Sequence, residues 1–270
     1  MVRKPQGSEY SQSDLGLTSN TLPNADELIR SMESAIALKK KYTIFRKNRS
    51  TITESEFLEM ENLHEIGLEY LNRKQFGDAL KNFERILEIN PDDADALLHK
   101  GEILAKTGKR DLALRTFEKI TEFNPANIDA LMHLAYILGT GRNPIEAIQY
   151  YDEVLYWEPN NSEALLNKSR ELIILGRNQE ALEVLKEIKT VSQDLMGDAW
   201  FNEGEALFRL KKYTEALEVF ERLLTFNPKD HEGWYMKGKC LSQVGRKSEA
   251  KKAFLVAKSI SPNLKKAMLK

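Results

Sequence analysis

The strongest constraint on the fold of this chain is a short phrase that recurs along its length. One copy, GDALKNFERILEINP, ends at Pro91, and another, TEALEVFERLLTFNP, ends at Pro228. An alanine marks the register, with intervals of 34, 34, 34, 35 and 34 residues between the successive alanines Ala79, Ala113, Ala147, Ala181, Ala216 and Ala250. A fixed period in this range is typical of a solenoid in which each unit packs against the next.

Each copy is the second half of a longer unit, whose positions 4, 8 and 11 lie on one helical face. Position 8 is small in every unit: Gly67, Gly101, Ala135, Ser169, Gly204 and Gly238. This small residue and the alanine at position 20 allow two antiparallel helices to approach closely. Position 24 fills the space beside that contact, with Phe83, Phe117, Tyr151, Leu185, Phe220 and Phe254. Proline at position 32 ends the second helix.

These positions match the pattern W-x2-L-G-x2-Y…A-x3-F…P, and the chain therefore resembles the tetratricopeptide repeat family. The six units span residues 60–93, 94–127, 128–161, 162–196, 197–230 and 231–262. The resemblance implies an all-α, right-handed superhelical solenoid of antiparallel helix pairs, whose concave face binds peptides or other proteins. Position 7 departs from the preferred leucine, with Lys100, Lys168, Glu203 and Lys237. The connection KTVSQDLMGD, residues 189–198, has one extra residue and Gln193 where proline is expected.

The resemblance also implies a binding groove, because family members present positions 2, 5, 6, 9 and 12 of the first helices to the concave side. The candidate partner-binding residues are His64, Leu68, Leu98, His99, Glu102, Met132, His133, Tyr136, Leu166, Asn167, Arg170, Phe201, Asn202, Glu205, Phe208, Tyr235 and Lys239. An apolar floor beside hydrogen-bonding side chains suits a peptide or an amphipathic helix. The alternative is that the aromatic residues at positions 5 and 12 stack between neighbouring helices.

Position 2 is acidic in five units, with Asp95, Asp129, Glu163, Asp198 and Glu232. We interpret these carboxylates as first-turn residues that complement the helix dipole, rather than as a row of ligands. His99 and His133 share position 6 in adjacent units and are expected to be neighbours. Two imidazoles without a third ligand fit groove or surface histidines better than a metal site.

The ends of the chain differ in charge from its middle. The net charge of −1 divides into +4 for residues 1–50, +6 for residues 251–270 and −11 for the residues between them. An acidic solenoid body disfavours nucleic acid as a partner and fits a basic or amphipathic peptide. The alternative is that this charge serves solubility alone. The segment KKKYTIFRKNR, Lys39 to Arg49, carries six basic residues and no acid. We interpret it as a solvated helix face that caps the first unit, and the alternative is that it binds an anionic partner, nucleic acid or a membrane surface.

The segments outside the repeats are expected to differ in structure. Residues 1–23 have few large apolar side chains and are expected to be a disordered tail. Residues 24–50 are expected to form an amphipathic basic helix, and residues 263–270 a short C-terminal cap segment. Thr53 and Glu56 have the spacing of a capping box at the start of a long helix that leads into the first unit.

No HExxH, Walker A or GxSxG motif occurs in the sequence, so we expect a non-enzyme without a cofactor or a small-molecule substrate. No apolar run is long enough to span a bilayer and no secretory signal is recognised, so we expect a cytoplasmic protein. The favoured function is a protein–protein interaction scaffold or adaptor. The alternatives are a structural protein that self-associates into a homo-oligomer through the solenoid ends, and a binder of anionic surfaces through Lys39 to Arg49.

Overall fold

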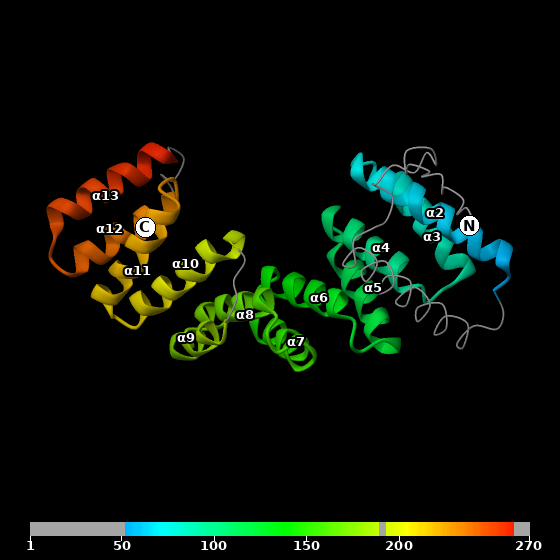
Figure 1. Cartoon of the computed structure of the whole chain (residues 1–270), viewed down its shortest axis with the longest axis horizontal. Helices are drawn as coiled ribbons and strands as arrows, with labels where there is room; N and C mark the ends of the chain where they lie inside the picture. The colour runs from blue at the N-terminus through cyan, green and yellow to red at the C-terminus, as the bar shows by residue number, and fades with distance from the viewer. Residues whose placement is uncertain (1–51, 189–192, 262–270) are drawn as a thin grey trace, which may run out of the picture. The chain divides into compact units, whose positions relative to one another are not determined.

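The computed structural model describes residues 52–188 and 193–261, in which every regular element is an α-helix (Figure 1). The first helices of the pairs are α2 (Glu54–Asn72), α4 (Ala94–Lys106), α6 (Ile128–Thr140), α8 (Ser162–Ile174), α10 (Gln193–Arg209) and α12 (His231–Gln243). The second helices are α3 (Phe76–Ile89), α5 (Arg110–Phe123), α7 (Pro144–Trp157), α9 (Asn178–Glu187), α11 (Tyr213–Phe226) and α13 (Lys247–Ile260). This all-α array confirms the fold class expected from the repeats. The expected tail, basic helix and C-terminal cap segment lie outside the described residues.

The chain divides into two compact units, residues 1–57 and 58–270. In the first unit, the described residues 52–57 contain the predicted capping box. The amide of Thr53 donates to Glu56 Oε2 at 2.8 Å, and the amide of Glu56 donates to Thr53 Oγ1 at 3.3 Å. These reciprocal hydrogen bonds satisfy two backbone donors at the start of α2.

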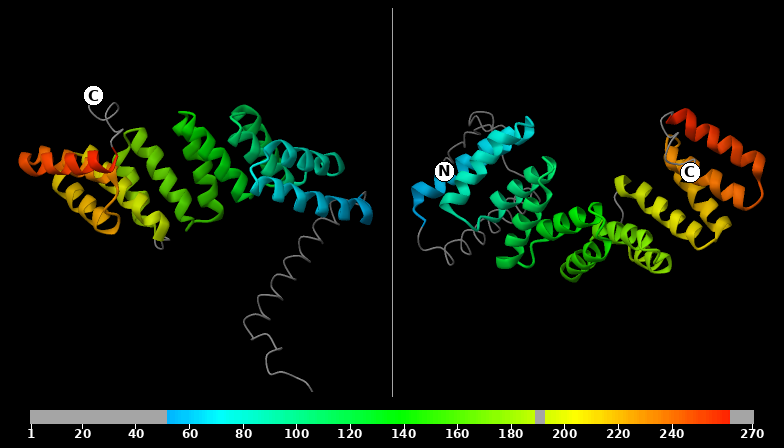
Figure 2. Two further views of the ribbon diagram at one scale, coloured as in Figure 1. Left: turned by 90° about the horizontal axis from the view of Figure 1, so that it is seen from above. Right: turned by 180° about the vertical axis from the view of Figure 1, so that it is seen from behind.

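In the second unit, the helices from α3 onward each pack against the next helix in the chain (Figures 1 and 2). The first helices also contact one another from pair to pair: α4 with α6, α6 with α8, α8 with α10, and α10 with α12. The first helices therefore form one layer, and residues at the same position of successive units become neighbours in space.

In the pairs whose position 8 is glycine or alanine, a side chain of the second helix packs against this small residue of the first helix. A Cβ atom added to Gly101 would lie 2.6 Å from the ring of Phe117, and one added to Gly204 would lie 2.7 Å from the ring of Phe220. Both phenylalanines are fully buried. The close approach predicted for the two helices is confirmed in these pairs, because any side chain at Gly101 or Gly204 would overlap the ring.

The turn between the helices of a pair requires one residue in the left-handed region. Position 15 has a positive φ in all six units, at Lys74 (59°), Gly108 (78°), Arg142 (65°), Gly176 (76°), Lys211 (64°) and Gly245 (84°). Glycine adopts this conformation without steric cost, but half of the units place a lysine or an arginine there. The packing of the two helices therefore determines the backbone conformation of this turn, even where the residue itself disfavours a positive φ.

The fifth unit differs from the sequence expectation at its start. We predicted that residues 189–198 connect the fourth and fifth units and that Asp198 lies in a first turn, but α10 already begins at Gln193. Asp198 is thus an interior residue of a helix 17 residues long, and that part of the prediction was wrong. The reason is the missing cap, since α4, α6, α8 and α12 begin directly after an Asp or Asn that caps them, whereas Met196 at the equivalent place has no side-chain acceptor and lets the helix extend backward.

A glycine pair tests the packing contact at position 8. Gly101→Ala forces a methyl group into the Phe117 ring and should lower the free energy of unfolding by about 1–3 kcal/mol. Gly77→Ala, in α3, has no atom within 4 Å of the added methyl and should be neutral or stabilising by up to about 1 kcal/mol. Urea denaturation of both variants measures the difference, and equal effects would contradict the assigned contact.

Candidate functional site

The first helices α4, α6 and α8 start at similar side-chain caps. Asp93 Oδ1 accepts from the amide of Ala96 at 3.0 Å, and Asn127 and Asn161 accept in the same way at their own helices. A cap fixes the residue at which a helix begins, and hence the direction in which each later side chain points. Positions 5, 6 and 9 consequently recur on one face of the helix layer.

A cavity of about 770 Å³ lies on this face between α4, α6 and α8. Five candidate residues line it: Glu102, Met132, His133, Tyr136 and Asn167. We call this cavity and its lining the α4–α6–α8 groove. The structure thus brings together part of the predicted set, contributed by three successive units.

Further residues line the groove that the sequence analysis did not select for binding. They are Ala105, Lys106, Gly108, Arg110, Ile128, Asp129, Ile137, Thr140, Asn161 and Glu163. Asp129 and Glu163 lie in the first turns of α6 and α8, as predicted, but they also face the groove. The sequence shows that position 2 is acidic. It does not show that these two residues line the same cavity as Tyr136, because that depends on how the helices pack.

Glu102 lies between two histidines where α4 meets α6. Its Oε1 is 3.3 Å from His133 Nε2, and its Oε2 is 3.6 Å from His99 Nδ1. The contact with His133, and then that with His99, lowers the pKa of Glu102 below its ordinary value of 4.5. The ring of His133 also stacks on Phe117, with centroids 4.8 Å apart. The two histidines, which were predicted to be neighbours, thus both contact the carboxylate of Glu102.

A second polar cluster lies where α8 meets α6 and α7. Arg170 Nη2 donates to Glu171 Oε1 at 3.3 Å, and the Glu171 side chain is almost completely buried. A Cβ atom on Gly139 would lie 2.6 Å from Glu171 Oε1, so only glycine leaves room for this carboxylate. Burial raises the pKa of the nearby Tyr151 hydroxyl. Arg170 was predicted as a groove residue, but Glu171 was not.

The candidate residues of α10 and α12 form a separate group. Lys239 Nζ lies 4.6 Å from the ring centroid of Phe208 and 5.8 Å from that of Tyr235. Glu205 forms an ion pair with Arg209 of its own helix at 2.7 Å. Phe201 packs against Phe220 of α11, with centroids 5.9 Å apart. Aromatic residues of this group thus make the stacking contacts that the sequence analysis raised as an alternative to ligand binding.

Asn202 is a buried polar residue that connects two units. Its Nδ2 donates to Ser169 Oγ at 3.1 Å and to the carbonyl of Leu166 at 3.3 Å. Leu166, also a candidate, is itself buried. A buried amide needs such partners, and these hydrogen bonds hold α10 against α8.

The remaining candidates belong to the first two units and do not line the α4–α6–α8 groove. His64 of α2 packs edge-on against Phe83 and lies 5.3 Å from the His99 ring. Leu68 is half-buried in the same helix, and Leu98 packs against the core around Phe117.

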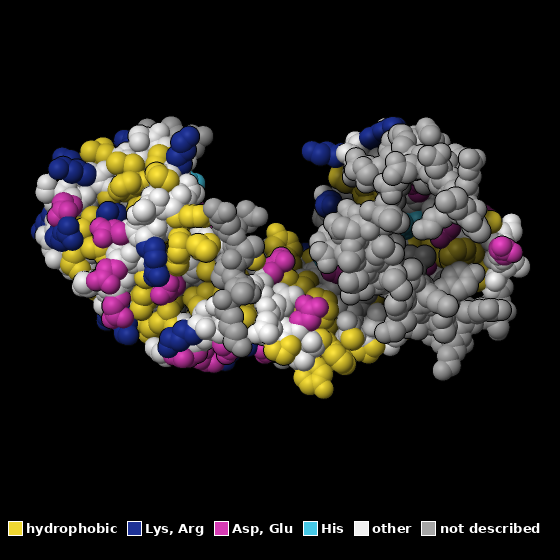
Figure 3. Space-filling view, in the orientation of Figure 1, with side chains coloured by type: hydrophobic (Ala, Val, Ile, Leu, Met, Phe, Trp, Pro, Cys, Tyr) yellow, Lys and Arg dark blue, Asp and Glu magenta, His cyan; other side chains and the backbone are white. Residues whose placement is uncertain are grey.

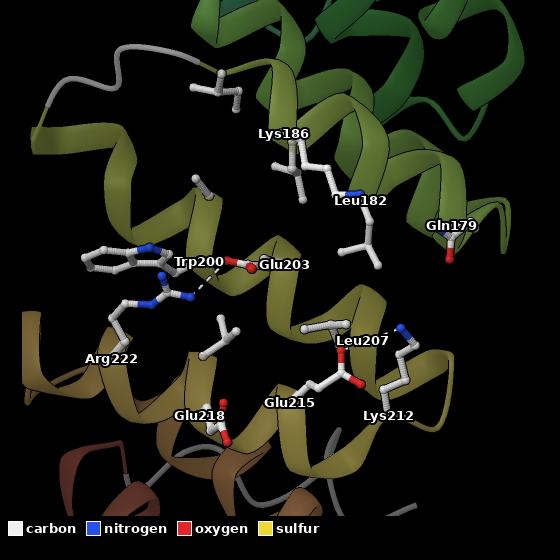
Figure 4. A pocket seen from close by; sticks show the side chains of 14 residues that line it. Gln179, Leu182, Lys186, Trp200, Glu203, Leu207, Lys212, Glu215, Glu218 and Arg222 are labelled. Atoms are coloured by element: carbon white, nitrogen blue, oxygen red, sulfur yellow. Dashed lines mark hydrogen bonds and ion pairs between the residues drawn. The ribbon is translucent and has the colours of Figure 1, made fainter.

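A larger cavity of about 850 Å³ lies between α9, α10 and α11 (Figure 4). The guanidinium of Arg222 lies 5.4 Å from the ring centroid of Trp200 and forms an ion pair with Glu203 at 3.3 Å. Apolar side chains such as Leu182 and Leu207 share the lining with further charged residues, among them Lys212 and Glu215. This cavity contains none of the predicted binding residues.

Residues 52–188 and 193–261 contain neither a cluster of metal ligands nor a helix suited to a membrane. No group of three or more His, Cys, Asp or Glu residues in these ranges is arranged to hold a metal ion. None of the helices in these ranges combines the length and the apolar character that crossing a membrane demands.

A layer of first helices that builds a groove from several units defines an α-helical repeat protein. Tetratricopeptide repeat models match residues 70–137, 128–161, 197–230 and 231–264, together more than half of the chain. The chain therefore belongs to the tetratricopeptide repeat family. These matches leave out the fourth unit, in which proline is missing.

Solved structures with the same fold are only distantly similar in sequence. A tetratricopeptide repeat protein from Parabacteroides merdae is 19% identical, with 73% of this chain and 77% of that one covered and a TM-score of 0.64. PilF from Pseudomonas aeruginosa is 16% identical, with coverage of 78% and 95% and a TM-score of 0.64. YrrB, described as a repeat protein with an unusual peptide-binding site, is 20% identical, with coverage of 67% and 93% and a TM-score of 0.56. No curated protein matches significantly.

The lowered pKa of Glu102 predicts a pH dependence of stability. The stabilising contribution of its carboxylate is fully present above pH 4.5 and is lost as the pH falls through the lowered pKa. The free energy of unfolding of the wild type should therefore exceed that of Glu102→Gln by more at about pH 6 than at about pH 3. Chemical denaturation at both pH values measures this difference.

The same comparison in a His133→Asn background provides the control. Because His133 is the main cause of the shift, the pH dependence of the Glu102→Gln effect should shrink there. An effect of Glu102→Gln that is the same at both pH values in the wild-type background would exclude the assigned interaction.

Proposed function

We propose that this chain is a non-catalytic protein–protein interaction scaffold that holds a peptide or a helix of a partner protein in the α4–α6–α8 groove. The observation that carries this proposal is the cavity of about 770 Å³ on the layer of first helices. Tetratricopeptide repeat domains generally mediate protein–protein interactions, and the family models detect no enzymatic family in this chain.

The chemistry of the groove supports a peptide ligand. Met132, Tyr136 and Ile128 offer apolar contacts, while Asn161, Asn167 and Thr140 offer hydrogen bonds. Apolar surface with a few convergent polar groups is typical of sites that bind a side chain and orient its backbone. The peptide-binding site of YrrB, a structure with the same fold, is consistent with this use of the repeat.

Tyr136 is the most informative residue for a test because its ring is exposed and yet lines the groove. The residue is 52% exposed, so Tyr136→Ser removes binding surface without opening the core. We expect affinity capture from the native cell lysate to lose at least one partner with Tyr136→Ser, as identified by mass spectrometry. Phe201→Asp is a poorer choice, because it would place a carboxylate against the ring of Phe220.

Tyr156→Ser is the matched control. Tyr156 lies on α7, is 77% exposed and does not line the groove, and hydrophobic side chains gather on the surface over this helix (Figure 3). Partners that depend on the groove should be retained by the control. If Tyr136→Ser captured every partner of the wild type, the groove would not be the working site. The two alternatives, self-association through the ends and anionic binding through Lys39 to Arg49, would then be favoured.

A further inference from the structure

We propose that the joint between the fourth and fifth units is a hinge, which closes when Lys186 of α9 and Glu203 of α10 pair across the cavity between α9, α10 and α11. This inference goes beyond the proposed function and does not depend on it. Three observations carry it: charged residues that are not paired across this joint, apolar side chains that line the cavity half-buried, and a buried contact that holds one side of α10.

The first observation is how the other joints are closed at position 7. At three of them, a carboxylate oxygen at position 25 of one unit lies close to the lysine Nζ at position 7 of the next: Glu84 and Lys100 (2.9 Å), Asp152 and Lys168 (2.6 Å), and Glu221 and Lys237 (3.0 Å). At the joint of the second and third units, position 7 is Leu134, which is fully buried. Each of these four joints is thus closed by an ion pair or by a buried leucine.

The joint between the fourth and fifth units has the same charges in reverse order, with Lys186 at position 25 and Glu203 at position 7. Both residues line the cavity, and they come from opposite sides of it (Figure 4). Lys186 Nζ lies 2.9 Å from Glu183 Oε1 of its own helix, and Glu203 Oε2 lies 3.3 Å from Arg222 Nη2 of its own unit. The two charges that could join the units are therefore each paired within their own unit.

The second observation is the partial exposure of apolar side chains at this joint. Ala199, at position 3 of the fifth unit, is half-buried and lines the cavity. Trp200 and Leu182 are also half-buried and line it. Position 3 is buried in the second, third, fourth and sixth units, at Ala96, Ala130, Ala164 and Gly233. Closing the cavity would remove apolar surface from water, which favours the closed arrangement.

The third observation is the buried contact between α10 and α8. Asn202 donates hydrogen bonds to Ser169 Oγ and to the carbonyl of Leu166, and all three residues are buried. Leaving a buried amide without partners is costly, whereas exposed ion pairs exchange easily. The contact of α10 with α8 can therefore persist as the axis of the hinge while the side of α10 that faces α9 moves.

The closed arrangement exchanges one set of exposed ion pairs for another. Lys186 leaves Glu183, and Glu203 leaves Arg222, so that the two can pair as their counterparts do at three other joints. Such exposed pairs differ little in free energy, so the two arrangements can interconvert. The α4–α6–α8 groove and the aromatic residues of α10 and α12 lie on opposite sides of the joint. The hinge therefore changes their relative positions.

The test uses a carbodiimide, which joins an amine to a carboxylate that lies beside it, on the full wild-type chain. We expect mass spectrometry to find a cross-link between Lys186 and Glu203, together with the link between Lys100 and Glu84 that the structure already allows. Arg222→Gln frees Glu203 from its competing partner. It should raise the yield of the Lys186–Glu203 link by roughly two- to fivefold, the factor that corresponds to one exposed ion pair.

Arg209→Gln is the matched control, because Arg209 pairs with Glu205 of the same helix at 2.7 Å and does not line the cavity. It should leave the yield of the Lys186–Glu203 link unchanged. The hinge would be overturned if this link were missing while the Lys100–Glu84 link formed, or if Arg222→Gln left its yield unchanged. A link from Lys186 to Glu205 in equal yield would also overturn it, because Glu205 lies outside the cavity and would be reached only by local unfolding.

Discussion

The structure depends on one recurring contact, in which a side chain of the second helix packs against a glycine or an alanine of the first helix. Where that residue is glycine, as at Gly101 and Gly238, the ring of the phenylalanine occupies the space that a Cβ atom would need. The contact sets the distance between the helices of a pair and buries the ring. Because it recurs in successive units, the pairs can stack in a regular array, and a solenoid has no central core to replace it.

The groove is a consequence of this regularity. Similar pairs with similarly capped first helices bring α4, α6 and α8 into contact with the same faces in register. Side chains from three units then share one cavity, although no unit could build it alone. The left-handed turn residues show the strength of the constraint, because Lys74 and Arg142 adopt a conformation that favours glycine.

Residues that depart from the repeat give the layer of first helices its individual character. Glu171 stands at a position that is apolar in the flanking units, and Gly139 provides the room for its carboxylate. Glu102 joins two histidines of adjacent units. By contrast, the aromatic residues of α10 and α12 follow the repeat pattern more closely, and the rings of Phe201 and Tyr235 pack against the second helices. Positions that packing does not determine are thus the ones at which the units differ.

The sequence by itself determined the period, the helix pairs, the small-residue contacts and the capping box at Thr53, because each depends on residues close in the chain or on the same position in every unit. Only the tertiary structure decided which candidates share a cavity, and that Asp129 and Glu163 join them. It also explained the lysines at position 7, since Lys100 lies 2.9 Å from Glu84 of the preceding unit. Such contacts join one unit to the next. The repeat period does not say which side chains will pair, so these contacts can be seen only once the helices are packed.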